Sequence, residues 1–195
     1  MGCFKEETNK DISVIVENES NKEVTKQNNS SANYSSLFDT YSCDITIAEL
    51  AKVLQIPESD IVLGENQSAE HCVFKLKGFG KGYENMGSQL RFGPSFSTKK
   101  QNKKVITNHL KEKKEMPNGM IMGRDILLAD AGDCYITFQP LQGRVLILNE
   151  NYERLFMISY GSKASTQNRT KAQHDDLTQK IKNLANLLVT KHKNQ

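Results

Sequence analysis

The sequence predicts an α+β fold in which an antiparallel sheet of about six to seven strands is backed by about three helices. Three observations support this prediction. Apolar residues recur at helical intervals in three segments, and short apolar runs occupy the regions between them. The turns between those runs have hairpin length, and parallel strands would need long crossovers. The elements follow in the order helix, strands, helix, strands, helix.

Each predicted helix begins at a threonine that is followed three residues later by Glu or Gln, which is capping-box spacing. The pairs are Thr46 with Glu49, Thr98 with Gln101, and Thr170 with Gln173. The residues expected to face the core are Ile47, Leu50, Ala51 and Leu54 in the first helix, Val105, Ile106, Leu110 and Met116 in the second, and Leu177, Ile181, Leu184 and Leu188 in the third. Pro57 and Pro117 end the first two helices.

The predicted strands fall in two groups. The first group is "SDIVLGENQSAEHCVFKLKG", read as two short strands with a polar loop, followed by "SQLRFG". The second group is "RDILLADA", "DCYITFQP", "GRVLILN" and "RLFMISYG". Gly132-Asp133, Gln142-Gly143 and Asn149-Glu150-Asn151 separate the members of the second group, as turn residues do in a meander.

Composition divides the chain into a tail over residues 1–40 and one folded domain over residues 41–195. Residues 1–44 contain 4 Lys against 8 Asp and Glu, with only scattered apolar residues. Such a segment cannot bury enough apolar surface to offset the entropy of ordering, so we expect an acidic, disordered tether.

Two segments of the folded domain are basic although the net charge of the chain is only +3. Residues 99–115 hold 7 Lys against 2 Glu, and residues 163–195 hold 7 Lys and Arg against 2 Asp. The lysines of the first segment are Lys99, Lys100, Lys103, Lys104, Lys111, Lys113 and Lys114. Such blocks are typical of solvated helix faces, and the alternative is a surface for an anionic lipid headgroup, glycan or nucleic acid.

The stretch "KGFGKGY" is a candidate ligand surface formed by Lys77, Phe79, Lys81 and Tyr83. Its first half matches an RNA-recognition strand motif, but its second half is too glycine-rich to form the strand on which bases would stack. We therefore expect a loop between strands, with exposed aromatic rings that suit a carbohydrate or a protein partner. Nucleic acid is not the expected partner.

The start "MGCFKEE" admits three interpretations. Myristate on Gly2 with palmitate on Cys3 is one, but that pattern favours Ser or Thr where this chain has Glu6. An incidental thiol is another. The third is that Gly2-Cys3 ends a bacterial lipobox, so that Cys3 carries acyl chains and the tail becomes a tether at the membrane.

The residues that follow favour the third interpretation. Cys3 with Lys5, Glu6 and Glu7 resembles the short lysine-plus-acids signal of surface-exposed lipoproteins of Bacteroidetes. This resemblance covers five residues. It implies a protein anchored by lipid to the outer membrane and exposed at the cell surface.

Cys43 precedes the first predicted helix and Cys72 opens a strand. If the domain folds in an oxidising compartment, we expect these two cysteines to form a disulfide, which would close a loop of about thirty residues. A cysteine before a "TIAELAKVL" helix and a second one in a "CVF" strand also resemble a pattern in small uncharacterised bacterial lipoproteins.

Cys134 alternates with Ile136 and Phe138, which places it on the apolar face of the sheet. A buried, inert thiol is the expectation. The opposing hypothesis is a small enzyme that uses Cys134 as nucleophile with His71, His109 or His174 as base, although no local signature of cysteine proteases is present.

The sequence predicts neither a metal site nor a cofactor. It has no Cys-x-x-Cys pair, and no two histidines stand four residues apart. No run approaches the roughly 18 apolar residues of a spanning helix. The function expected from these observations is therefore binding by a lipid-anchored domain, with a Cys134 enzyme or a polyanion binder as alternatives.

Overall fold

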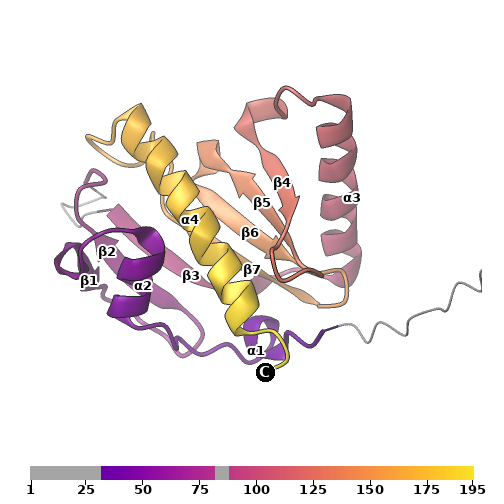
Figure 1. Cartoon of the computed structure of the whole chain (residues 1–195), viewed down its shortest axis with the longest axis horizontal. Helices are drawn as coiled ribbons and strands as arrows, with labels where there is room; N and C mark the ends of the chain where they lie inside the picture. The colour runs from indigo at the N-terminus through magenta and orange to yellow at the C-terminus, as the bar shows by residue number, and fades with distance from the viewer. Residues whose placement is uncertain (1–31, 82–87) are drawn as a thin grey trace, which may run out of the picture. The chain divides into compact units, whose positions relative to one another are not determined.

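Figure 1 shows the computed structural model of the chain, which describes residues 32–81 and 88–195. Within those residues, seven antiparallel strands form one sheet and four α-helices accompany it, which confirms the predicted α+β class. The strands are β1 (Ile61–Leu63), β2 (Cys72–Leu76), β3 (Ser88–Phe96), β4 (Asp125–Leu128), β5 (Tyr135–Gln139), β6 (Arg144–Leu148) and β7 (Arg154–Ser159). The helices are α1 (Ser35–Phe38), α2 (Ile47–Leu54), α3 (Lys99–Glu115) and α4 (Lys171–Lys191).

The strand order across the sheet is β1-β2-β3-β7-β6-β5-β4. Two meanders, β1 to β3 and β4 to β7, therefore join where β3 pairs with β7. The register of that junction runs from Arg91 opposite Ser159 to Phe96 opposite Arg154. Since α3 connects the two meanders, strands that are distant in sequence become neighbours at the centre of the sheet.

One face of the sheet carries the main core. Helix α4 lies across this face with α2 beside it (Figure 1). Leu177, Ile181, Leu184 and Leu188 of α4 are fully buried, as the spacing predicts. Each such side chain stabilises the fold by roughly 2 kcal/mol through removal of apolar surface from water.

The N-terminal capping pairs act as the sequence predicts in two of the helices. Thr46 and Glu49 form a complete capping box on α2, and Thr170 and Gln173 form one on α4. In α3, the side chain of Thr98 accepts from the backbone N–H at the third helical position. These bonds satisfy donors that a helix leaves free at its start, and each contributes about 1 kcal/mol.

Helix α3 covers part of the opposite face, and only part of its predicted apolar stripe faces the sheet: Ile106 is buried, as predicted. Ile106 packs with Leu146 and Leu148. Leu110 is 39% exposed and Met116 is 41% exposed, so the prediction that they face the core is wrong.

The buried residues of α3 are Asn102, Ile106 and His109. The amide of Asn102 donates to the carbonyl oxygens of Asn149, Tyr152 and Arg154. These three bonds rotate the polar side of the helix start toward the sheet, and helical periodicity alone does not reveal that rotation.

The folded part begins before residue 41, where the sequence places its boundary. Tyr34, Leu37 and Phe38 are fully buried members of the main core. The Phe38 ring stacks on Tyr152 with centroids 4.7 Å apart. Residues 33–40 therefore belong to the fold and not to a tether. Helix α1 has four residues, which is too few for an apolar period to be visible in the sequence.

Candidate functional site

Several predicted site residues lie outside the described ranges. They are Cys3, Lys5, Glu6, Glu7 and Tyr83. Their roles as lipidation site, export signal and part of a ligand surface stay predictions. Among the helices of residues 32–81 and 88–195, none is long and apolar enough to cross a bilayer.

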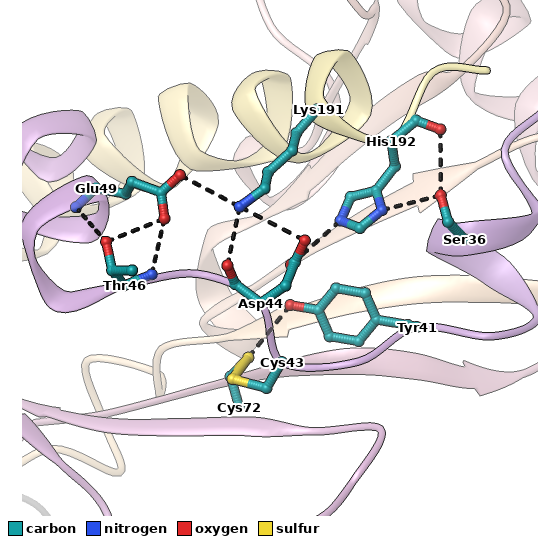
Figure 2. A network of polar contacts seen from close by, with 9 residues as sticks. All are labelled: Ser36, Tyr41, Cys43, Asp44, Thr46, Glu49, Cys72, Lys191 and His192. Atoms are coloured by element: carbon teal, nitrogen blue, oxygen red, sulfur yellow. Dashed lines mark hydrogen bonds and ion pairs between the residues drawn. A yellow bond between two sulfur atoms is a disulfide. The ribbon is translucent and has the colours of Figure 1, made fainter. Parts of the chain in front are cut away.

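Cys43 and Cys72 form the expected disulfide. Their Cα atoms are 5.3 Å apart, and the bond joins the segment before α2 to β2. Cys72 is fully buried, and the hydroxyl of Tyr41 lies 3.2 Å from its sulfur (Figure 2). The bridge is thus part of the core and is shielded on the Cys72 side from reductants in solution.

Next to the disulfide, the last turn of α4 is tied to the chain that precedes α2 (Figure 2). The Lys191 ammonium donates to the carbonyl oxygen of Asp44 at 2.9 Å and pairs with the Glu49 carboxylate at 3.2 Å. The backbone N–H of Thr46 and the Lys191 ammonium hold the pKa of Glu49 below its usual value.

His192 completes this network on its far side. Its ring is 3% exposed, and Nδ1 lies 3.0 Å from the hydroxyl of Ser36. Nε2 is 3.6 Å from the Asp44 carboxylate, which is too long for a hydrogen bond. Burial lowers the pKa of His192, although Asp44 opposes that effect. The imidazole therefore lies between Ser36 of α1 and Asp44 of the chain before α2, and it links both to the end of α4.

Cys134 is buried, as the strand alternation predicts. Its sulfur lies 3.6 Å from the Asn149 amide nitrogen, and no hydrogen bond of the described residues joins it to a histidine. Burial raises the pKa of the Cys134 thiol to about 12. The thiolate that a nucleophilic mechanism requires is therefore absent at neutral pH.

We expect iodoacetamide to leave Cys134 unmodified in the folded protein at neutral pH and to modify it in urea. Burial and the raised pKa both act against the reaction, because only an accessible thiolate attacks. The extent of Cys134 modification is measured by mass spectrometry on the Cys3→Ala protein. Rapid carboxamidomethylation without denaturant would contradict the assignment of an inert thiol and favour the enzyme hypothesis.

The loop at residues 77–81 does not present its aromatic ring to solvent. Phe79 is 7% exposed and belongs to the main core, so the expectation of an exposed ring is wrong. Two interactions fix the loop to the segment before α4. Arg169 Nε donates to the carbonyl oxygen of Phe79, and Lys81 forms an isolated β-bridge with Gln167. The Lys77 ammonium donates to the carbonyl oxygen of Ser59.

The lysines of α3 are only in part available to an anionic partner. Lys103 lies 3.7 Å from Glu150, Lys111 lies 3.8 Å from Glu115, and Lys113 lies 2.7 Å from Asp125. Lys99, Lys100, Lys104 and Lys114 form no ion pair with any residue of the described ranges. They are dispersed along a solvated helix face, which is the arrangement that surface solubility alone requires.

A different set of polar and charged side chains lies together on the part of this sheet face that α3 does not cover. Arg91 of β3 is opposite Ser159 of β7, and Ser159 is also opposite Arg144 of β6. Arg144 is in turn opposite Gln139 of β5. We call these four residues the arginine row. Their neighbours along each strand, such as Phe92 and Val145, point into the main core, so the row points away from it.

The arginine row borders two hollows. One, of about 230 Å³, is lined by Met122, Arg124, Gln139, Leu141, Gln142 and Arg144. The other, of about 200 Å³, is lined by Gln89, Arg91, Ser159, Tyr160, Gly161, Ser165 and Thr166. Since Arg144 and Ser159 are paired across neighbouring strands, the two hollows adjoin. The combined surface offers guanidinium, amide and hydroxyl donors to a ligand.

The arginine row is not apparent in the sequence. Arg91 stands at a polar position of an alternating strand, and Arg144 stands at the start of an apolar run, so neither pattern distinguishes the arginine from an ordinary surface residue. Only the pairing of β3 with β7 brings the two meanders, and hence the two arginines, together. Within the described ranges, no group of three or more acidic, histidine or cysteine side chains is arranged to hold a metal ion.

Comparison with protein-family models, with curated proteins and with solved structures finds no match to this chain.

Proposed function

We propose that this protein is a lipid-anchored lipoprotein of the bacterial outer membrane, exposed at the cell surface, whose folded domain binds a partner and does not catalyse a reaction. Cys3 is the residue that carries the acyl chains, and Lys5, Glu6 and Glu7 form the export signal. The partner is a protein or a glycan, and the open face of the sheet is the surface that meets it.

One observation supports this proposal above the others: the folded domain contains the disulfide between Cys43 and Cys72. Disulfides persist outside the reducing cytoplasm and are rare within it. A domain that depends on such a bond suits the cell envelope, where an acylated N-terminus would place it.

Binding is favoured over catalysis by the state of the titratable groups. The one free cysteine of the described residues is buried with a raised pKa. His109, His174 and His192 all have a pKa lowered chiefly by burial, and no hydrogen bond within the described residues joins any of them to Cys134. In contrast, Arg91 of the arginine row is exposed, Arg144 is half-buried, and the row lies beside hollows of about 230 and 200 Å³.

The anchor is tested by substitutions in the first seven residues. Cys3→Ala should release the protein from membranes into the soluble fraction, because the acyl chains provide the binding energy, about 0.8 kcal/mol for each buried CH₂. Replacement of Lys5, Glu6 and Glu7 by Ala should leave the protein in the membrane fraction but protect it from protease added outside the cells. Fractionation and protease shaving of the expressing bacterium measure the two results.

Gly2→Ala serves as the control that separates the alternatives. Dual acylation by myristate and palmitate predicts that this change alone detaches the protein, since myristate is added to Gly2. An incidental thiol predicts that none of the substitutions changes the distribution. A Cys3→Ala protein that stays firmly in the membrane fraction would contradict the proposal that Cys3 carries the lipid anchor.

A further inference from the structure

We infer that the arginine row, together with the exposed apolar side chains beside it, is a binding site for an acidic protein segment that also carries apolar side chains. This inference deepens the proposed binding function by naming the site and the chemistry of the partner.

Arg91 and Arg144 are separated by one strand, β7, which places Ser159 between them. Neighbouring strands lie about 4.8 Å apart, so the two Cα atoms are about 10 Å apart. Two guanidinium groups at that separation can each bind one carboxylate of an extended peptide, or can close on a single one above Ser159. Guanidinium binds carboxylate through two parallel hydrogen bonds, which adds orientation to the charge.

The positive charge of the row is not neutralised by the described part of the chain. Neither Arg91 nor Arg144 forms an ion pair with any residue in 32–81 or 88–195. Glu65 pairs with Lys75 and Glu112 pairs with Arg124, so these two carboxylates have partners outside the row. The Nε of Arg144 donates to the side-chain oxygen Oε1 of Gln139 at 2.5 Å, which leaves the terminal nitrogens of the guanidinium available to a ligand.

The hollow beside Arg144 has two apolar side chains among the six that line it. Met122 and Leu141 both line it, and each is 61% exposed. Ile121, next in the chain to Met122, is 53% exposed. Met122 also adopts a left-handed backbone conformation with φ of 61°, which costs a non-glycine residue about 1 kcal/mol or more. Exposed apolar side chains gathered beside unpaired arginines are typical of protein–protein interfaces, where Met and Arg are enriched.

The same features disfavour other polyanions. Single-stranded nucleic acid binds on exposed aromatic rings, and among residues 32–81 and 88–195 no exposed aromatic side chain lines either hollow or the arginine row. An acidic glycan would use the arginines but would leave Met122 and Leu141 without a function. A peptide that alternates carboxylates with apolar side chains uses both halves of the surface.

The test is selection from a phage-displayed library of random dodecapeptides on the immobilised full chain. We expect the enriched peptides to carry at least two Asp or Glu together with Leu, Ile, Met or Phe. The most enriched peptide is then synthesised with a fluorescent label, and its Kd is measured by anisotropy. Arg91→Gln and Arg144→Gln should each weaken binding about tenfold, and Leu141→Ser should weaken it several-fold.

Lys100→Gln is the matched control, because it removes one exposed positive charge from α3 without touching the row, and it should leave the Kd unchanged. Circular dichroism of each variant verifies that the fold is retained. Enriched peptides without acidic residues, or equal affinity of all variants, would overturn the inference. Heparin or an oligonucleotide that binds more tightly than the peptide and depends on Arg91 and Arg144 would also overturn it, in favour of a glycan or a nucleic acid. None of these outcomes depends on Cys3, so the proposal of a lipid anchor and the inference about the ligand are tested independently.

Discussion

Replacement of Arg169 by Met is expected to lower the free energy of unfolding by about 4 kcal/mol. Arg169 is 4% exposed, and its guanidinium donates to the carbonyl oxygens of Phe79, Tyr160 and Gly161 and to the hydroxyl of Ser88. These acceptors belong to the 77–81 loop, the start of β3 and the two residues that follow β7. Met fills a similar volume but leaves the buried carbonyl oxygens of Phe79 and Tyr160, and the part-buried one of Gly161, without this donor. Each buried one costs about 1–3 kcal/mol.

Urea unfolding followed by far-UV circular dichroism measures this effect, since the chain has no tryptophan to report by fluorescence. Lys100→Met provides the control, because it also exchanges one positive charge for Met but at an exposed site, where changes stay within about 0.5 kcal/mol. Arg169→Lys keeps the positive charge but lacks the planar guanidinium group. Its decrease in the free energy of unfolding should therefore lie between those of Arg169→Met and Lys100→Met. A loss below about 1 kcal/mol for Arg169→Met would show that the buried carbonyls find other donors.

Loss of the disulfide is expected to lower the free energy of unfolding by roughly 3.5 kcal/mol. The bond between Cys43 and Cys72 closes a loop with a sequence separation of 29, and in the chain-entropy model a loop of that size restricts the unfolded chain by about this amount. The Cys43→Ser/Cys72→Ser double variant also introduces a hydroxyl at the fully buried Cys72 position beside Tyr41. The hydroxyl of Tyr41 can partner it, so little is added to the loss.

The effect is measured by urea unfolding with and without dithiothreitol, in a Cys3→Ala background that leaves Cys134 as the remaining thiol. Dithiothreitol should shift the midpoint of the parent protein toward that of the double variant. It should not shift the double variant, which serves as the control. If the parent keeps its midpoint under conditions in which mass spectrometry shows the bond to be reduced, the stabilising role of the disulfide is wrong.

The sequence by itself determined the class of fold and most of its elements. The strands of both meanders alternate or run apolar between turn residues, and the helices at residues 47–54 and 171–191 carry both a capping pair and an apolar stripe. These are local signals, because they depend on residues a few positions apart. The burial of Cys134 was predictable for the same reason, since its position in the strand alternation is local.

The tertiary structure alone decided which surfaces are open. Helix α3 turns Asn102 inward and Leu110 outward because three distant carbonyl groups accept from the Asn102 amide. Phe79 is buried because Arg169, ninety residues later in the chain, donates to its carbonyl oxygen. Arg91 and Arg144 meet on one face because β3 pairs with β7 and not with the next strand in sequence. Each of these outcomes depends on a contact between residues far apart in the chain, and propensity, periodicity and capping carry no information about such contacts.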